Sequence, residues 1–482
     1  MIGYTKHFNA IVVGVGGMGS AACYQLARRG QRVLGLERFD IPHDLGSSHG
    51  YTRIIRLAYY EHPSYVMLLK RAYELWDDME RRSGKKLLYK TGSIDAGPAD
   101  SWVFKGSLRS CVEHDLPHEV LTGIELTERF PGYRLPHDLM AVYQPEGGFL
   151  LPEKATVAFV QAAQGLGAEI HGREQVLGWE PQGDGVRVVT DRAEYSADSL
   201  VVTAGSWEAS LLPFLNGLAV PERQVLAWLQ PEKPEYFTPE RFPVFNALVE
   251  EGRYYGFPVF GVPGFKFGRY HHFEEQGRPE VLNREATRAD EEMLREFAAR
   301  YFPDGAGPVM TLKACMFTNS PDKHFIIDLH PEYPQVSFAA GFSGHGYKFA
   351  SVIGEIMADL SERRESRHDI RLFGLGRLTG QVSALYAQDY GAPRRPRSAI
   401  QAPPLFGARQ RSGARRHSRA LPQSRPGQVA RLQHSGPPRA SRHDQARFGG
   451  ERGHRIRQDW QYVEDTTDPL YWERDSIKPF WF

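Results

Sequence analysis

The 482-residue chain contains only three cysteines, with neither a CxxC pair nor a zinc-type Cys/His spacing. This excludes a disulfide framework, and we expect no metal site. No apolar stretch approaches the ~20 residues of a membrane span, and the N-terminus shows no charged and then apolar leader. We therefore expect a cytoplasmic protein without membrane contact.

Lysine is missing from a long stretch near the C-terminus. Residues 391–457 contain sixteen arginines, no lysine and only Asp444 and Glu451 as acids. Such a composition cannot bury a core, so we predict a basic extension over 378–482 that is disordered to about residue 457. It could be a nucleic-acid-binding tail, although an out-of-frame or fused reading of GC-rich DNA is the interpretation we favour. Residues 458–482 stay unassigned.

The remaining chain has the composition of a globular protein, since 41% of all residues are hydrophobic and the length suffices for two or three domains. Near the N-terminus, apolar runs at 11–13 and 32–36 flank a helical composition at 21–29. This order predicts a strand, a helix and a second strand, which together form a βαβ unit.

A glycine motif connects the first strand to the helix of this unit. Gly14, Gly16 and Gly19 have the GxGxxG spacing, which suits a tight turn, close approach of a pyrophosphate and close helix packing. Glu37 ends the second strand, where a carboxylate can accept a hydrogen bond from a ribose hydroxyl. The unit predicts dinucleotide binding at the helix N-terminus without distinguishing NAD from FAD.

Two arginines follow a loop of Gly, Ser and His residues. Arg53 and Arg56 are three residues apart, a spacing that we interpret as one face of a helix. A solvated basic face is one interpretation of the pair. Its position close to the dinucleotide unit favours a role in carboxylate binding or next to a flavin.

Six ordered motifs between about residues 8 and 375 carry a family resemblance. They read GVGGMGS, SSHGYTRIIR, YGFP, FKFGRYHH, KACMFTNSPDKHFIID and GFSGHGYKFASVIGEI. In these motifs the chain resembles the monomeric sarcosine oxidase family, which includes N-methyltryptophan oxidase and pipecolate oxidase. The resemblance implies an FAD-dependent amine oxidase.

The implied fold is α/β, with a Rossmann-like FAD-binding domain interleaved with a substrate domain on a mixed β-sheet. We expect the FAD-binding domain to comprise residues 1–85, 151–217 and 321–377. The substrate domain would comprise residues 86–150 and 218–320.

The resemblance gives Cys315 a specific role. In the family, a cysteine in the context K-x-C-x-Y-x-x-x-P-D carries a covalent thioether to the 8α-methyl group of FAD, and Cys315 occupies that place. A buried free thiol is the alternative. Phe317 stands where sarcosine oxidases usually have tyrosine, and with the pair Tyr254 and Tyr255 it favours a substrate bulkier than sarcosine.

Three further residues are implied to lie at the flavin. Lys266 resembles the lysine beneath the flavin N5 that activates O₂, because a buried ammonium stabilises superoxide; a surface lysine is the alternative. Arg53 and His49 are expected near the flavin ring. The glycine-rich loop at Gly344 and the helix after it are expected to face the edge of the flavin that becomes negative on reduction.

The remaining implied residues concern the substrate. Arg56 and Lys348, the latter expected one turn into a helix, resemble the pair that holds the substrate carboxylate; for Lys348, a solvated first-turn residue is the alternative. Tyr255 matches a tyrosine near the substrate or is ordinary core packing. His271, chosen over His272, is expected to be the active-site histidine.

The implied reaction oxidises a secondary amino acid, N-methyl or cyclic, to an imine that hydrolyses, while O₂ becomes hydrogen peroxide. The expected partners are that amino acid and O₂, with no nucleic acid, and we expect a monomer. An FAD-dependent dehydrogenase with another acceptor, or a noncatalytic flavoprotein with a nucleic-acid-binding tail, are the alternatives. Sarcosine, N-methyl aromatic amino acids, pipecolate, proline and glycated amino acids remain unranked.

Overall fold

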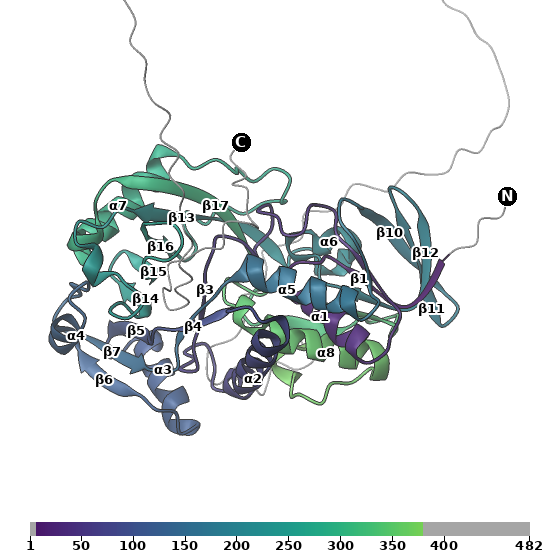
Figure 1. Cartoon of the computed structure of the whole chain (residues 1–482), viewed down its shortest axis with the longest axis horizontal. Helices are drawn as coiled ribbons and strands as arrows, with labels where there is room; N and C mark the ends of the chain where they lie inside the picture. Colours follow the sequence, from purple (N-terminus) through teal and green to yellow (C-terminus); the bar gives the residue numbers. More distant parts are fainter. Residues whose placement is uncertain (1–5, 379–482) are drawn as a thin grey trace, which may run out of the picture. The chain divides into compact units, whose positions relative to one another are not determined.

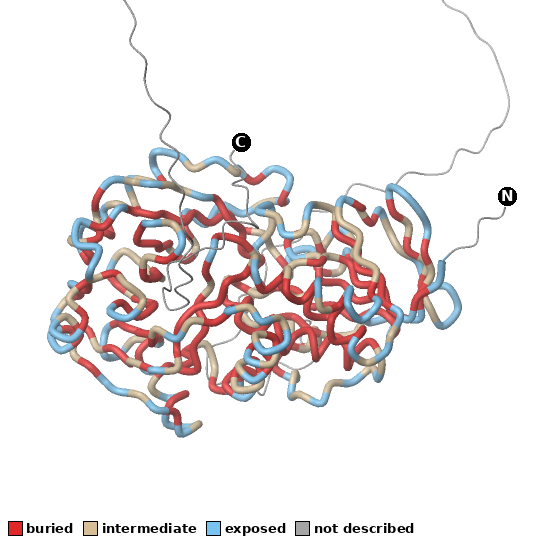
Figure 2. The backbone as a smooth tube through the Cα atoms, in the orientation of Figure 1, coloured by how far each residue is buried: buried red, intermediate tan, exposed pale blue. Residues whose placement is uncertain are grey.

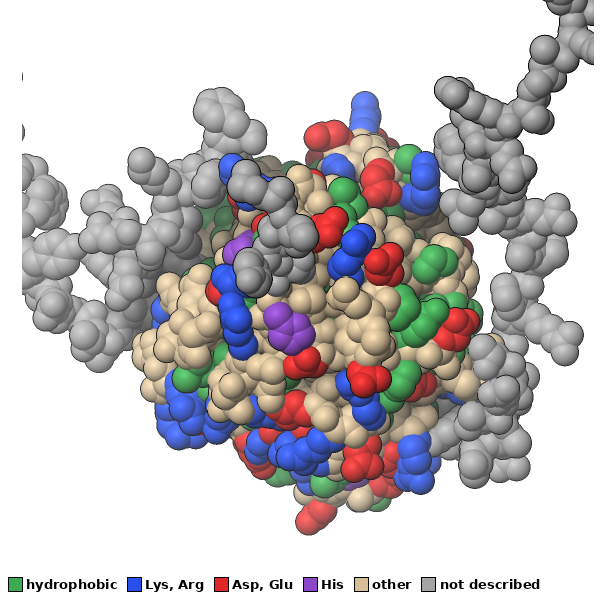
Figure 3. Space-filling model, turned by 90° about the vertical axis from the view of Figure 1, so that its right-hand side faces the viewer, with side chains coloured by type: hydrophobic (Ala, Val, Ile, Leu, Met, Phe, Trp, Pro, Cys, Tyr) green, Lys and Arg blue, Asp and Glu red, His purple; other side chains and the backbone are tan. Residues whose placement is uncertain are grey.

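The computed structural model describes residues 6–378. The predicted basic extension lies outside the described residues except for its first residue, Leu378. Within the described part, none of the helices is long and apolar enough to cross a bilayer. The described side chains on the face shown in Figure 3 intersperse Lys and Arg with Asp and Glu, so charge of one sign does not gather there.

The first sheet has eight strands and contains the predicted βαβ unit. Its order is β10-β11-β12-β1-β2-β9, with β19 beside the second half of β12 and β18 beside β19. The bounds are β1 Lys6–Val13, β2 Val33–Leu36, β9 Glu169–His171, β10 Val176–Gln182, β11 Gly185–Thr190, β12 Glu194–Val202, β18 Ile326–Leu329 and β19 Val336–Ala340. The run from β9 through β2, β1 and β12 to β19 is parallel.

Helices pack on one face of this sheet (Figure 1). They are α1 Gly17–Arg28, α2 Tyr65–Ser83, α5 Pro152–Gly165 and α8 Ala350–Arg363. Ala10 and Val12 of β1 join the core beneath the helices, whereas Ile11 and Val13 join a core on the opposite face. This alternation explains why β1 is an unbroken apolar run, because a parallel strand covered on both faces is apolar on both sides.

The second sheet also has eight strands, in the order β17-β13-β16-β15-β14-β5-β7-β6. The bounds are β5 Ser93–Pro98, β6 Glu119–Thr122, β7 Leu139–Gln144, β13 Val220–Leu229, β14 Val244–Val249, β15 Gly252–Phe257, β16 Phe265–Arg269 and β17 Val309–Asn319. Only the β14 and β5 pair is parallel among these strands, so the sheet is mixed. An aromatic core fills one face, where Tyr254 stacks on Phe297 of α7 Arg288–Tyr301 with 3.7 Å between ring centroids.

A small third sheet joins β3 Arg53–Ile55, β8 Gly148–Leu150 and β4 Leu88–Lys90. The other α-helices are α3 Trp102–Glu113, α4 Gly123–Arg129 and α6 Glu208–Leu211. Short 3₁₀ helices span Gly205–Trp207, Pro213–Leu215, Pro234–Tyr236, Pro303–Gly305, Tyr347–Phe349, Arg371–Phe373 and Leu375–Arg377. Figure 2 shows the buried backbone running through both large sheets, with exposed residues mainly in loops and on outer helix faces.

The chain alternates between the two large sheets along its length. The first sheet takes strands from residues 6–36, 169–202 and 326–340, and the second takes strands from 93–144 and 220–319. The interleaved α/β architecture with a mixed second sheet is therefore the predicted one. The domain boundaries drawn from the sequence remain a prediction, which this sheet membership supports.

Candidate functional site

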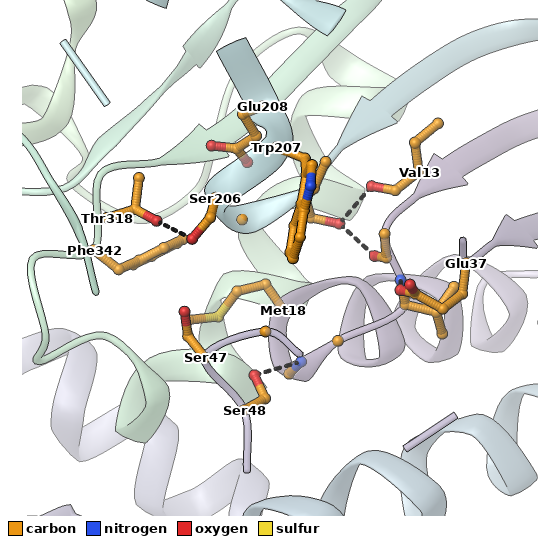
Figure 4. A pocket seen from close by; sticks show the side chains of 18 of the residues that line it. Val13, Met18, Glu37, Ser47, Ser48, Ser206, Trp207, Glu208, Thr318 and Phe342 are labelled. Atoms are coloured by element: carbon orange, nitrogen blue, oxygen red, sulfur yellow. Dashed lines mark hydrogen bonds between the residues drawn. The ribbon is translucent and has the colours of Figure 1, made fainter. Parts of the chain in front are cut away.

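A long cavity lies at the carboxyl ends of β1 and β2 and reaches the loop before α8 (Figure 4). Its empty space, part of which is open to solvent, is about 1470 Å³. Residues within 13–18, 36–48, 203–211, 316–318 and 339–347 form most of the wall. Ligands of open α/β sheets bind outside the carboxyl ends of the strands, so this is the expected place for a dinucleotide.

The glycine motif forms the turn at one wall of the cavity. Gly14 has a φ of +88°, and a Cβ there would lie 2.5 Å from the Thr203 carbonyl oxygen. A Cβ on Gly19 would collide with the carbonyl oxygen of Gly14, whereas one on Gly16 would meet nothing closer than the Ser48 hydroxyl at 3.7 Å. Two glycines therefore allow close packing, and Gly16 keeps the backbone open toward the cavity, which suits a diphosphate at the start of α1.

Glu37 lines the same cavity at the end of β2, on the side of Val13 in Figure 4. Its two carboxylate oxygens accept hydrogen bonds from the Val15 and Phe39 amides at 2.9 and 3.0 Å. Each oxygen keeps a further lone pair, so Glu37 is held in place and still able to accept from a ribose hydroxyl. The predicted role of Glu37 is compatible with this position and stays a prediction.

Cys315 lies on β17 beside the cavity, and its neighbours Met316 and Phe317 line the wall. It is 4% exposed, and the Arg53 guanidinium donates to its Sγ at 3.6 Å. The implied role of Cys315 is compatible with this position and stays a prediction.

His49 lies in the loop that leads to Arg53 and is 2% exposed. Within the described residues, neither of its ring nitrogens has a hydrogen-bond partner. Burial, with Arg53 nearby, holds the pKa of His49 well below its usual range, so the ring is neutral. A buried imidazole without partners is unusual and leaves its nitrogens available to a bound group.

Lys266 is buried on β16 with three oxygen atoms around its amine. Its Nζ donates to the carbonyl oxygens of Gly50 and Thr52 at 2.6 and 2.8 Å, and the Thr52 hydroxyl lies at 2.8 Å. Burial, together with Arg53, pushes the pKa of Lys266 well below its usual value. Because a hydroxyl both accepts and donates, these contacts satisfy the ammonium and the neutral amine alike.

Arg56 is almost completely buried between aromatic rings. Its guanidinium carbon lies 4.5 Å from the ring centroid of Tyr59 and 3.9 Å from that of Tyr60. Its Nη2 donates to Glu61 at 2.8 Å, and its Nε lies 3.6 Å from Asp95. Burial raises the pKa of Glu61, but Arg56 and other cations lower it to about 2, so this carboxylate is ionised.

Lys348 also lies close to the ring of Tyr59, which Arg56 contacts. Its Nζ lies 5.3 Å from the Tyr59 centroid and donates to the His345 carbonyl oxygen at 2.7 Å. Burial, with Arg56 nearby, lowers the pKa of Lys348 to about 7. Lys348 lies in the 3₁₀ turn that precedes α8, not one turn into the helix as expected from the sequence.

The expectation that Arg53 and Arg56 share a helical face is wrong. Arg53 begins the strand β3 and Arg56 follows its last residue. Extended residues three apart point to opposite sides, and accordingly Arg53 contacts Cys315 while Arg56 contacts Glu61. The two arginines therefore have different neighbours, and the roles that the family resemblance implies for them stay predictions.

Tyr255, on β15, is brought to the site, whereas His271 is not. The Tyr255 ring lies 4.8 Å from Tyr270, which in turn lies 5.8 Å from the cavity residue Phe317. His271 has a φ of +54° and bonds Glu222 through Nδ1 at 2.8 Å. The structure thus places Tyr270, and not His271, beside Tyr255, although no measured property tests either role.

Gly344 lies in the loop between β19 and α8, as predicted. It has a φ of +79°, and a Cβ there would lie 2.5 Å from the Phe317 ring. The missing side chain lets this loop pack directly on Phe317 at the cavity wall.

Sequence reasoning missed the residues that form the cluster around Arg56 and Lys348. They are Tyr59, Tyr60, Glu61, Asp95, Arg253 and Tyr270. One signal could have found Tyr270. Side chains alternate between the two faces of a strand, so residue 270, and not residue 271, lies on the same face as Lys266.

Comparisons with known proteins agree with this site. Residues 9–360 match the family described as FAD dependent oxidoreductase. The chain is 41% identical over 377 residues to monomeric sarcosine oxidase of Streptomyces avermitilis, an alignment that covers 77% of this chain and 98% of that protein. It is 36% identical over 373 residues to N-methyl-L-tryptophan oxidase of Yersinia pseudotuberculosis, covering 77% of this chain and 99% of the relative.

A solved structure shares the fold as well. The open form of NikD, an unusual amino acid oxidase essential for nikkomycin biosynthesis, superposes with a TM-score of 0.67 at 26% identity, over 77% of this chain and 98% of that one. These similarities confirm the family resemblance drawn from the six motifs.

Proposed function

The chain belongs to the family of FAD-dependent oxidoreductases, and on this premise we propose that it oxidises a secondary amino acid with O₂. The amine and O₂ give an imine and hydrogen peroxide, and water then hydrolyses the imine. The observation that carries the proposal is the convergence of Arg56 and Lys348 on one tyrosine ring, Tyr59. The relatives named above act, by their names, on sarcosine and N-methyl-L-tryptophan.

In the proposed complex, Arg56 and Lys348 bind the substrate carboxylate. Two cations on one carboxylate explain selection of amino acids over simple amines. Glu61 already accepts from Arg56 at 2.8 Å, so the substrate carboxylate has to share or replace this contact. The tyrosines around the pair limit access of water, which strengthens the ionic contacts.

The cofactor FAD supplies the acceptor for two electrons from the carbon next to the amine and passes them to O₂. Gly16 and the start of α1 would hold its diphosphate, and Glu37 its ribose. Lys266 in its ammonium form would stabilise the charge that develops when O₂ is reduced. Tyr255 and Tyr270 would bound the space occupied by the substrate.

We further propose that Cys315 carries the FAD through a thioether from its Sγ to the 8α-methyl group. Its place beside the cavity wall formed by Met316 and Phe317, in contact with Arg53, supports this assignment. The test is to precipitate the purified protein in acid and to locate the yellow chromophore. Flavin that stays with the wild-type pellet but is released from Cys315→Ala would support the thioether, and release from both would refute it.

The activity is tested by measuring hydrogen peroxide from a series of secondary amino acids under air. Peroxide formation with sarcosine or an N-methyl amino acid is the expected result. Turnover with a dye under argon but little oxygen consumption would instead indicate a dehydrogenase. We also propose a cytoplasmic monomer that binds no nucleic acid, which chromatography at defined concentration and a filter-binding assay of the full chain can check.

A further inference from the structure

Arg253 is a partly buried cation for which the described residues provide no carboxylate at ion-pair distance. It lies on β15, and its guanidinium carbon is 3.6 Å from the ring centroid of Tyr270, 5.0 Å from that of Trp102 and 5.6 Å from that of Tyr60. Its Nη1 donates to the Tyr60 hydroxyl at 3.3 Å. Aromatic faces thus hold the guanidinium in place while most of its five N–H donors remain available.

The fully buried arginines of the described chain have carboxylate partners. Arg223 binds Asp290 through both terminal nitrogens at 2.9 and 2.7 Å, and Arg377 binds Asp322 at 2.7 and 3.0 Å. Arg253 is less deeply buried, and three aromatic rings take the place of a carboxylate around it. The N–H donors that these rings leave free can bind an anion.

The position of Arg253 connects it to the proposed substrate site. Tyr60 contacts Arg56 on one side of the cluster and Arg253 on the other. Tyr270, which Arg253 covers, lies beside the cavity residue Phe317. Arg253 therefore lies one aromatic ring away from Arg56.

Two cations of the cluster, Arg253 and Lys348, lie beyond ion-pair distance of every acid in the described chain. Arg56 and Arg253 and, at neutral pH and below, Lys348 are cations, while Glu61 and Asp95 are the acids beside Arg56. Asp95 is already engaged by Ser107 and Asn246, each at 2.8 Å. A substrate bound by its α-carboxylate at Arg56 and Lys348 leaves Arg253 for another anion.

We propose that Arg253 binds a second carboxylate, on the side chain of the substrate, so that the preferred substrates are secondary amino acids with an acidic side chain. The inference rests on the proposed function and deepens it by naming the substrate class. A planar guanidinium matches a carboxylate through two parallel hydrogen bonds. Nothing in this role involves the electron transfer, so Arg253 determines specificity only.

The first test compares substrates that differ only in side-chain charge, using the full-length holoenzyme. N-methyl-L-aspartate and N-methyl-L-glutamate are compared with N-methyl-L-asparagine and N-methyl-L-glutamine by kcat/KM of peroxide formation. For whichever of the two acids is the better substrate, we expect kcat/KM to exceed that of the corresponding amide by at least about tenfold. In Arg253→Met the acid should no longer be preferred, because an ionic contact buried in the site is lost: its kcat/KM should fall by about tenfold or more, while that of the amides changes less than about threefold.

Two variants separate lost recognition from lost structure. Arg253→Lys keeps the charge and should retain part of the preference for the acid. Arg269→Met removes another arginine of the same sheet, one that donates to the His272 carbonyl oxygen, and should leave the preference unchanged. An equal loss on acids and amides in Arg253→Met, or no preference in the wild type, would refute the inference.

A binding measurement distinguishes this inference from the proposed function. Methylthioacetate and 2-(methylthio)succinate carry sulfur in place of the amine and differ by one carboxymethyl group. Their Kd values follow from changes in flavin absorbance and require no turnover. If none of the amino acids, sarcosine included, is oxidised, the proposed function fails, yet tighter binding of the diacid that disappears in Arg253→Met would still support the anion site. Equal affinities of the two acids in the wild type would overturn it.

Discussion

The ionisation of Lys348 should control how tightly the enzyme binds a carboxylate. Burial, with Arg56 nearby, lowers the pKa of this amine to about 7 in the free protein. Below pH 7 the ammonium form predominates and attracts an anion, and above pH 7 the neutral amine does not. The affinity for a carboxylate ligand is therefore expected to fall as the pH rises through 7.

The size of the effect follows from the position of the amine. A carboxylate about 4 Å from Nζ, at an effective dielectric constant near 20, gains about 4 kcal/mol. That energy raises the pKa of Lys348 in the complex by about three units. Between pH 7 and 9 the Kd should consequently rise about tenfold per pH unit, to about 100-fold at pH 9.

Methylthioacetate is a suitable ligand because it has no amine to titrate, and its Kd can be read from the flavin absorbance between pH 6 and 9. Lys348→Arg keeps a permanent charge and should give a flat profile. Lys348→Met should also be flat, with a Kd that stays roughly tenfold weaker than the wild-type value even at pH 9, because the bound wild type still keeps its ammonium there. Both variants retain Lys266, so titration of that amine would appear in all three profiles.

Two results would refute this reasoning. One is a wild-type Kd that changes less than about threefold between pH 6 and 9. The other is a Lys348→Arg variant that keeps the wild-type slope, since the titrating group would then be elsewhere.

Three further substitutions test other parts of the structure. Lys266→Met should slow reoxidation of the reduced enzyme by O₂ by about 100- to 1,000-fold, whereas the rate at which substrate bleaches the flavin without O₂ should change little. Stopped-flow absorbance measures both rates, and an equal loss in the two would contradict the assigned role. Gly19→Ala should lose FAD or fold poorly, because its methyl group would collide with backbone atoms. Gly165→Ala is the control, since no atom lies within 4 Å of its new Cβ. A normal ratio of flavin to protein absorbance in Gly19→Ala would count against the packing argument. Asp290→Ala should lower the free energy of unfolding, measured in urea, by roughly 3–5 kcal/mol, because it breaks a buried ionic network. Glu292→Ala, at an exposed position, should lower it by less than about 0.5 kcal/mol. A loss below about 1 kcal/mol for Asp290→Ala would show that the network contributes little.

The dinucleotide unit could be predicted in detail because its signals are local. The strand at 11–13, the helix at 21–29 and the strand at 32–36 were expected, and the structure has β1, α1 and β2 at Lys6–Val13, Gly17–Arg28 and Val33–Leu36. The glycine spacing depends on contacts within one turn and with one neighbouring strand. Such short-range constraints are visible in a single sequence.

Side-chain direction was harder to predict where the local structure was misjudged. Arg53 and Arg56 were assigned to a helix face, but they border a strand, and a period of two instead of 3.6 sends them to different parts of the site. His271 was chosen next to Lys266 along the chain, although a residue with φ of +54° leaves the strand and turns toward Glu222. The helical-face prediction was wrong in side-chain direction and not in residue type, and the role of His271 stays a prediction.

The sequence by itself determined the α/β class, the glycine turn, the family and the residue types that surround the proposed cofactor. The tertiary structure decided which distant residues meet: Arg56 after β3, Lys348 before α8 and Arg253 on β15 surround the same pair of tyrosines. It also decided that Arg56 has Glu61 as its partner while Arg253 has no carboxylate in the described chain. The physical reason is that local backbone preferences follow from neighbouring residues, whereas ion pairing and burial depend on contacts between segments up to about 290 residues apart.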